Sequence, residues 1–238
     1  MGSEMCIRDS PKTLRRWRRS APPSLTRRRG SCTRGWRGVV KREPVGRTLE
    51  DMSFEPGKAV VVDDPAQLAT YGRAFRKTGK RVVLVPLGTG LHAGHIALIR
   101  AAKSLLGGVV IVTYSGDEVP EDFAREGVDV VFHGDLPTDV RVVPQLDHLE
   151  DPALIARAVT RTIAAINATH ATDVVVGEKD FEELVALQQA VSGLRMEVLL
   201  HSLPTVRAAG GVAMSLRNAD VPEQFQDDAL ALSAALTA

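Results

Sequence analysis

The stretch that decides the fold is RVVLVPLGTGLHAGHIALIRAAK, from Arg81 to Lys103. It begins with the apolar run VVLV, which predicts a short buried strand that Pro86 ends. The flexible turn GTG comes next, at 88–90. Apolar residues then recur at helical spacing, at positions 96, 99, 102 and 106. The sequence therefore predicts a strand, a glycine turn and a helix in immediate succession.

His92 and His95 fall where the glycine turn passes into the first turn of this helix. Free backbone N–H groups and the positive end of the helix dipole meet at such a place and favour an anion. Residues three apart share a helical face, so both imidazoles can donate to phosphate oxygens, and Gly94 lets backbone approach a ligand. The simpler alternative is that both histidines only cap and pack the helix start.

The rest of the chain alternates between strand-like and helix-like segments. Strands are expected at 58–64, 82–85, 109–114, 128–132, 141–143, 172–176 and 196–203, and helices at 64–79, 92–107, 119–126, 181–194 and 223–238. A long helix opens at Asp151, with the apolar stripe Leu154, Ile155, Ala158, Val159, Thr162, Ile163 and Ile166. This alternation predicts an α/β fold with a Rossmann-like parallel sheet, whose ligands bind beyond the carboxyl ends of the strands.

Charge and cysteine are concentrated at the N-terminus. Residues 1–50 carry 14 Lys and Arg against 4 Asp and Glu, whereas the remaining residues carry 16 against 25. Both cysteines, Cys6 and Cys32, lie in the basic segment, which excludes a disulfide or a cysteine nucleophile in the rest of the chain. No apolar run reaches the roughly 18–20 residues of a membrane span, and the N-terminus lacks a secretory signal, so a cytoplasmic protein is expected.

Residues 1–51 are expected to be a disordered, arginine-rich extension, because a basic segment rich in Ser, Pro and Gly buries too little surface to fold. It could be a nucleic-acid arm, a targeting peptide or an unselected extension. We favour the last, with Met52 as a true start, and expect neither nucleic acid nor membrane as a partner. Residues 52–238 then form the Rossmann-like domain.

Two further segments follow predicted strands. Gly177, Lys179 and Asp180 open a helix, and there Lys179 suits a phosphate while Asp180 can accept from ribose hydroxyls or from Lys179; the alternative is a helix cap with a solvated ion pair. The second segment joins PTVR (204–207) to MSLRN (214–218) through Gly210 and Gly211. Such a loop could close over a triphosphate, or could be an ordinary surface loop.

Together these motifs carry a resemblance. HAGH at 92–95 resembles the HxGH signature of the adenylate-forming nucleotidyl transferases. A resemblance to the pantothenate synthetase (pantoate–β-alanine ligase) family is carried by three segments: VPLGTGLHAGHIALIRAAK at 85–103, GEKD at 177–180 and the PTVR–MSLRN loop. The resemblance implies an ATP-dependent ligase that condenses pantoate with β-alanine through a pantoyl adenylate, giving pantothenate, AMP and pyrophosphate. It also implies Mg²⁺ and a homodimer.

The resemblance implies a role for each matching residue. His95, His92, Lys179 and Arg217 would be catalytic, and Glu183 would bind the acid substrate. The residues that would hold ATP are Gly88, Thr89, Gly90, Gly94, Gly177, Asp180, Val206, Met214 and Ser215. No residue is assigned as a metal ligand.

The acid-substrate half departs from the family pattern. SGDEVPEDF (115–123) stands where the family has an FVNPxQF-type segment, the RPxHFxGV stretch is missing, and Glu183 replaces a glutamine. Position 88 is Gly rather than Met, Ser215 is followed by Leu216 rather than Ser, and the sequence stops where the family's C-terminal lid domain would start. The alternative function is therefore a catalytically impaired, nucleotide-binding paralogue that acts as a structural or regulatory partner.

Overall fold

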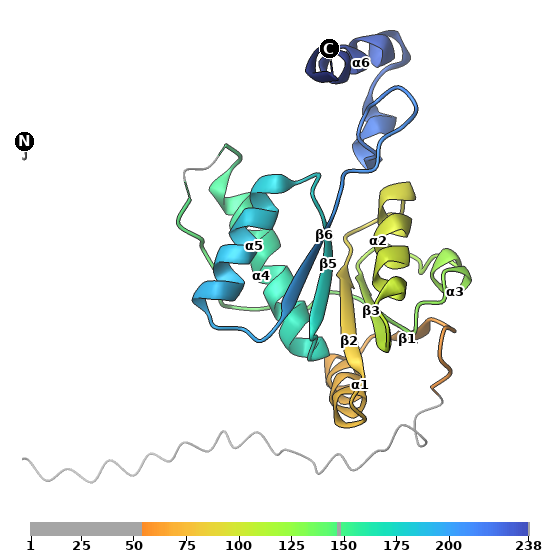
Figure 1. Cartoon of the computed structure of the whole chain (residues 1–238), viewed down its shortest axis with the longest axis vertical. Helices are drawn as coiled ribbons and strands as arrows, with labels where there is room; N and C mark the ends of the chain where they lie inside the picture. Colours follow the sequence, from red (N-terminus) through yellow and green to blue (C-terminus); the bar gives the residue numbers. More distant parts are fainter. Residues whose placement is uncertain (1–53, 147–148, 238) are drawn as a thin grey trace, which may run out of the picture. The chain divides into compact units, whose positions relative to one another are not determined.

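The computed structural model describes residues 54–146 and 149–237; the expectation for residues 1–51 lies outside them. The described chain forms a six-stranded sheet in which every neighbouring pair of strands is parallel (Figure 1). The strands are β1 (Val60–Val62), β2 (Arg81–Pro86), β3 (Gly108–Tyr114), β4 (Val130–His133), β5 (Asp173–Gly177) and β6 (Leu199–Leu203). The predicted Rossmann-like α/β sheet is thus confirmed.

Helices connect the strands. They are α1 (Pro65–Lys77), α2 (Ala93–Ser104), α3 (Asp122–Arg125), α4 (Pro152–Thr169), α5 (Phe181–Gly193) and α6 (Gln226–Thr237), with 3₁₀ turns at Leu216–Asp220 and Glu223–Phe225. The strand order is β1-β4-β3-β2-β5-β6. The chain therefore runs outward from β2 to β3 and β4 on one side, and then returns to β5 and β6 on the other. The carboxyl ends of β2 and β5 form the switch point, where such sheets bind ligands.

Alternate side chains of the central strands enter different cores. In β2, Val83 and Val85 pack with Leu98 and Ile99 of α2, whereas Leu84 packs with Val159 and neighbouring residues of α4 and α5. Residues of α1 pack over Val82 and the same face of β3 and β4. Both faces of the sheet are covered, with α2 on one and α4 and α5 on the other (Figure 1). A parallel sheet needs such cover, because both of its faces are apolar.

Two long helices begin as the sequence predicts. The carboxylate of Asp64 accepts from the backbone N–H of Ala66 at 2.9 Å, and that of Asp151 accepts from Ala153 at 2.8 Å. A proline follows each cap, at the position where a helix needs no N–H donor.

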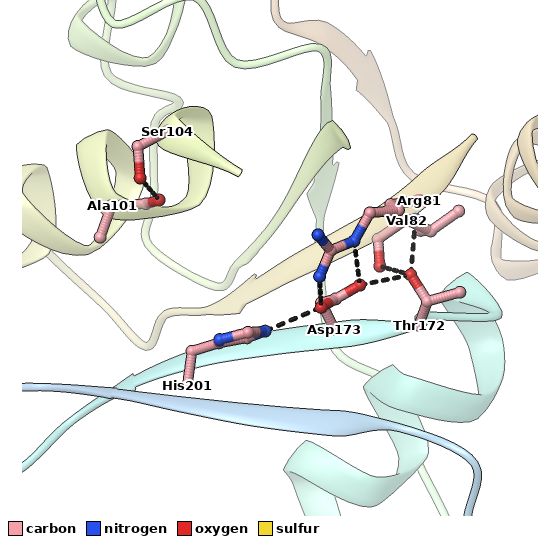
Figure 2. Close-up of polar contacts among 7 residues, drawn as sticks. All are labelled: Arg81, Val82, Ala101, Ser104, Thr172, Asp173 and His201. Atoms are coloured by element: carbon pink, nitrogen blue, oxygen red, sulfur yellow. Dashed lines mark hydrogen bonds and ion pairs between the residues drawn. The ribbon is translucent and has the colours of Figure 1, made fainter. Parts of the chain in front are cut away.

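A polar network joins the amino-terminal ends of β2 and β5 (Figure 2). The carboxylate of Asp173, 1% exposed, accepts from Arg81 in a bidentate ion pair whose Nε–Oδ2 distance is 3.1 Å. It also accepts from Thr172 Oγ1 at 2.7 Å and contacts His201 Nε2 at 2.7 Å. The network satisfies a buried charge that would otherwise destabilise the sheet.

Several local predictions are wrong. Residues 141–143 form no strand, because the Val142 N–H donates to Thr160 Oγ1 on α4 at 2.9 Å and the segment lies against that helix. Helix α2 ends at Ser104, which leaves Leu106 90% exposed, and Leu154 is 47% exposed although it was placed on the apolar stripe of α4. No helix within the described ranges is long and apolar enough to cross a membrane.

Candidate functional site

A cavity of about 600 Å³ lies at the carboxyl ends of the strands, the size of a typical small-ligand site. It takes residues from all three segments singled out in the sequence. Thirteen of the fourteen predicted site residues line it: Gly88, Thr89, His92, Gly94, His95, Gly177, Lys179, Asp180, Glu183, Val206, Met214, Ser215 and Arg217. The three segments converge because parallel strands end at the same edge of a sheet.

Gly90 is the exception and does not line the cavity. Its N–H donates to the hydroxyl of Tyr114 at 3.1 Å, and its φ of +73° is one that side-chain-bearing residues rarely adopt. A Cβ built there would lie 2.6 Å from Leu216 Cδ1. Gly90 therefore gives the turn its shape and lets the 214–218 loop pack onto it.

His92 caps α2 with its own side chain. Its Nδ1 accepts from the Gly94 N–H at 3.0 Å, so the ring proton lies on Nε2. One N–H that the sequence predicted to be free for an anion is therefore occupied by the histidine. Burial is the larger cause that lowers the pKa of His92, and the charge of Lys179 lowers it further. The neutral ring keeps Nε2–H as a donor beside the cavity.

His95 is held neutral more firmly. Burial lowers its pKa to about 4, helped by the nearby His92 and Lys179, while a hydrogen bond to the Gly90 backbone and the charge of Asp180 oppose the shift. Its Nδ1 is buried and has no hydrogen-bond partner among the residues that the structure describes. His95 is thus a neutral imidazole in the cavity wall, with spare hydrogen-bonding capacity.

Two of the cationic groups that line the cavity were singled out in the sequence, Lys179 and Arg217. Lys179 Nζ lies 2.9 Å from Asp180 Oδ1 in the turn after β5, and Arg217 Nη2 of the 214–218 loop lies 3.9 Å from the same oxygen. The sequence suggested ribose hydroxyls or Lys179 as hydrogen-bond donors to Asp180, and in the structure Lys179 is paired with it. A Cβ at Gly88 would meet nothing within 4 Å, and one at Gly177 would meet only the Lys179 N at 4.0 Å. Backbone can therefore approach a ligand closely at both glycines.

The 204–218 segment is folded rather than open. Arg207 bridges to Ala213 in an antiparallel turn, and the Met214 N–H donates to the Val206 carbonyl at 2.8 Å. A Cβ at Gly210 would lie 2.6 Å from Leu230 Cδ2 of α6, so the glycine permits close packing there. Ser215 Oγ accepts from the Arg217 N–H at 3.2 Å and starts the 3₁₀ turn. These bonds position Met214, Ser215 and Arg217 at the cavity.

The cavity lining also includes Glu183, in the first turn of α5, and Arg161, from α4. Because Glu183 is the residue expected to bind the acid substrate, we call the part of the cavity beside it the acid end. Burial raises the pKa of Glu183 to about 6; the charges of Asp180 and Glu150 add to the shift, while those of Arg161 and Lys179 oppose it. The Arg161 guanidinium reaches the carboxyl end of β3, where its Nη2 lies 3.4 Å from Ser115 Oγ.

Sequence reasoning missed several lining residues. Among them are Tyr114, Asp135, Leu136, Arg161, Leu184 and Leu187. Arg161 left no distinguishing signal, because Arg157 likewise lies beside the predicted apolar stripe of α4. Tyr114 left a usable signal, since it ends an apolar strand on the side where ligands bind.

The described residues contain no group of three or more His, Cys, Asp or Glu side chains able to hold a metal ion. Mg²⁺ commonly binds through phosphate oxygens, waters and one or two carboxylates. The side chains present thus fit a Mg²⁺ that arrives with a triphosphate, and Asp180 is the carboxylate nearest the cations of the site.

Comparisons with known proteins agree with this geometry. The family model described as pantoate-beta-alanine ligase matches residues 60–126 and 121–238. Pantothenate synthetase of Corynebacterium jeikeium is 33% identical over 219 residues, covering 79% of this chain and 71% of that protein. Pantothenate synthetase of Mycobacterium tuberculosis H37Rv is 35% identical over 211 residues, covering 76% and 68%.

Solved structures show the same fold. A pantoate-beta-alanine ligase from Francisella tularensis, complexed with beta-gamma ATP and beta-alanine, superposes with a TM-score of 0.64 at 22% identity, over 76% of this chain and 80% of that one. The pantothenate synthetase of Thermus thermophilus gives 0.62 at 24% identity, over 75% and 74%.

Proposed function

The chain belongs to the pantoate–β-alanine ligase family, and from this premise we propose that it is an ATP-dependent ligase that joins pantoate to β-alanine. Pantoate would be activated as an adenylate with release of pyrophosphate, and β-alanine would displace AMP. The observation that carries the proposal is the convergence of the histidine, lysine and arginine segments on one cavity at the switch point. We assign this activity to residues 52–238.

The nucleotide would occupy the wall that starts at Gly88. Gly88 and Thr89 would let the triphosphate approach the backbone, with Gly90 shaping the turn, and neutral His92 and His95 would donate hydrogen bonds to phosphate. Gly94, predicted to let backbone approach a ligand, instead makes room for the His92 ring, because a Cβ there would lie 2.8 Å from His92 Cε1. Gly177 and Asp180 would hold the ribose, while Val206 and Met214 would contact the adenine. The Francisella relative was solved with beta-gamma ATP and beta-alanine, which supports these ligands.

The side chains act by position and charge. Lys179 and Arg217 would stabilise the negative charge that develops as pyrophosphate leaves, with Ser215 donating to the outer phosphates. Neutral histidines suit this task, because they donate hydrogen bonds without adding charge next to Lys179. Mg²⁺, carried by the phosphates, would neutralise part of their charge. The protein itself would contribute no covalent step.

The experiment follows AMP formation by the full chain with ATP, Mg²⁺, pantoate and β-alanine. We expect turnover that His95→Ala reduces by about 100-fold or more, the range for one lost transition-state donor. His170, which is part-exposed and outside the cavity, supplies the matched control His170→Ala. Equal turnover in the wild type and His95→Ala would refute the assignment of the site.

A second function has its own supporting observation. Glu183 puts a carboxylate at the acid end, where the family pattern has a glutamine, and would repel an acid substrate while ionised. The alternative is a nucleotide-binding paralogue that acts as a structural or regulatory partner. ATP binding measured by calorimetry, with no exchange of pyrophosphate into ATP and no AMP formation, would favour it.

A further inference from the structure

Opposite charges face the acid end of the cavity without neutralising each other. Arg161 and Glu183 both line it, and the charge of Arg161 is close enough to oppose the rise in the pKa of Glu183. Among the described residues neither side chain has a salt-bridge partner within 4.0 Å, and the only side-chain hydrogen bond is the 3.4 Å contact from Arg161 to Ser115. A separated cation and anion in one cavity are complementary to a zwitterion.

The amine substrate of the proposed reaction is a zwitterion. β-Alanine carries a carboxylate at one end and an ammonium group at the other, and the ammonium must lose a proton before its nitrogen can attack. We propose, on the basis of the proposed function, that Arg161 and Glu183 form the amine subsite: Arg161 binds the carboxylate of β-alanine, and Glu183 is the general base for its ammonium group.

The proton and electron transfers balance. Glu183 takes one ammonium proton, which leaves a lone pair on nitrogen. That pair forms the C–N bond to the acyl carbon of the adenylate, while the bond from this carbon to the bridging phosphate oxygen breaks. AMP leaves with the bonding electrons, and the second proton of the new amide nitrogen passes to water. No oxidant, reductant or further reactant is required.

The surroundings of Glu183 suit a base rather than a permanent ion. Its pKa is raised to about 6, which leaves it ionised at neutral pH yet a stronger base than an ordinary glutamate. The charged groups that face it are Asp180, Arg161, Glu150 and Lys179, from α4 and the adjoining loops. Repulsion of the acid substrate is confined to the first half-reaction, because adenylation removes the carboxylate charge of that substrate.

The two half-reactions can be measured separately. Exchange of labelled pyrophosphate into ATP with pantoate alone reports activation, and AMP formation with β-alanine reports the complete reaction. We expect Glu183→Gln to keep or raise the exchange rate while slowing amide formation by about 100-fold. We expect Arg161→Met to raise the KM for β-alanine by about tenfold and to leave exchange unchanged. Exposed Glu197→Gln and Arg157→Met are the matched charge controls.

Hydroxylamine distinguishes a base from a structural residue. It is largely unprotonated at neutral pH and attacks acyl adenylates without a base, so it should form hydroxamate in Glu183→Gln at close to the wild-type rate. A variant slowed equally in exchange, amide formation and hydroxamate formation would overturn the inference and assign Glu183 to the acid. Absence of exchange in the wild type with every acid supplied would overturn the proposed function itself, and the inference with it.

Discussion

The imidazole ring of His92 stacks on that of His95, with ring centroids 3.7 Å apart and planes 24° from parallel. Two protonated rings at that separation would repel strongly, so a proton on one disfavours a proton on the other. Burial is the larger cause of the lowered pKa of each ring, and the partner ring adds to it for His95. The site thus presents neutral donors beside the cation Lys179.

The first prediction concerns stability in acid. The folded His95 has a pKa of about 4, below the ordinary value of 6.5, so the unfolded chain binds the extra proton as pH falls from 6.5 towards 4. The free energy of unfolding should therefore decrease over this window, by about 1 kcal/mol near pH 5 after allowance for the part-exposed ring. Urea unfolding at pH 7.5 and pH 5 measures this decrease. The free energy of unfolding of His95→Gln should fall by correspondingly less between the two pH values. A parallel loss in both proteins contradicts the prediction.

The second prediction uses a matched pair of glycines. Gly79 and Gly90 have φ of +74° and +73°, but a Cβ at Gly79 meets nothing within 4 Å, whereas one at Gly90 overlaps Leu216. Each alanine variant should cost about 1 kcal/mol for the left-handed backbone. Only Gly90→Ala should also displace the 214–218 loop and weaken ATP binding, by about tenfold. Calorimetric titration and thermal unfolding check both effects, and equal ATP affinity in the two variants would contradict the loop contact.

Much of the site could be predicted because it depends on order along the chain. Each motif follows a buried strand, and parallel strands bring their carboxyl ends to one edge, so HAGH, GEKD and the PTVR–MSLRN loop had to meet if the sheet formed. The caps Asp64 and Asp151 were equally predictable, because an aspartate before a proline is a local signal.

What the sequence could not reveal depends on tertiary contacts. Nothing local shows that Arg161 reaches Ser115, or that the pKa of Glu183 is set by groups from several elements. The segment 141–143 has the composition of a strand, but its backbone pairs with Thr160 of a helix formed later in the chain. The sequence left open whether His92 caps the start of α2, because the hydrogen bond that its Nδ1 accepts from the Gly94 N–H depends on the rotamer of His92, which spacing does not determine.

The third prediction concerns the Asp173 network. Burial alone would raise the pKa of Asp173, but hydrogen bonds from Arg81, Thr172 and His201 outweigh it and lower the pKa. The network should therefore stabilise the fold above the ordinary carboxyl pKa and lose this effect as pH falls through the lower, folded value. Replacing Arg81 with Met leaves the buried Asp173 charge with fewer partners and should clearly lower the free energy of unfolding.

An exposed ion pair supplies the control for this prediction. Arg100 pairs with Glu126 at 2.6 Å, and its side chain is 69% exposed, so Arg100→Met should lower the free energy of unfolding far less than Arg81→Met. Urea unfolding at neutral pH compares the two variants. Asp173 and Arg81 are not among the residues lining the cavity, so Arg81→Met should leave the KM for ATP unchanged at temperatures where it is folded. Equal losses of stability in both variants would show that the network has no special role.

The last prediction concerns how pH affects the acid substrate. With its pKa raised to about 6, Glu183 is ionised at pH 7.5 and largely protonated at about pH 5.5. The ionised form repels a substrate carboxylate and the neutral form can donate to it, so the KM for pantoate in pyrophosphate exchange should fall several-fold, up to about tenfold, at the lower pH. Glu183→Gln should show a low KM at both values, because an amide does not titrate. The KM for ATP, measured in the same assays, separates this effect from acid damage to the fold. A pantoate KM that responds to pH identically in the wild type and the variant would show that another group controls binding of the acid.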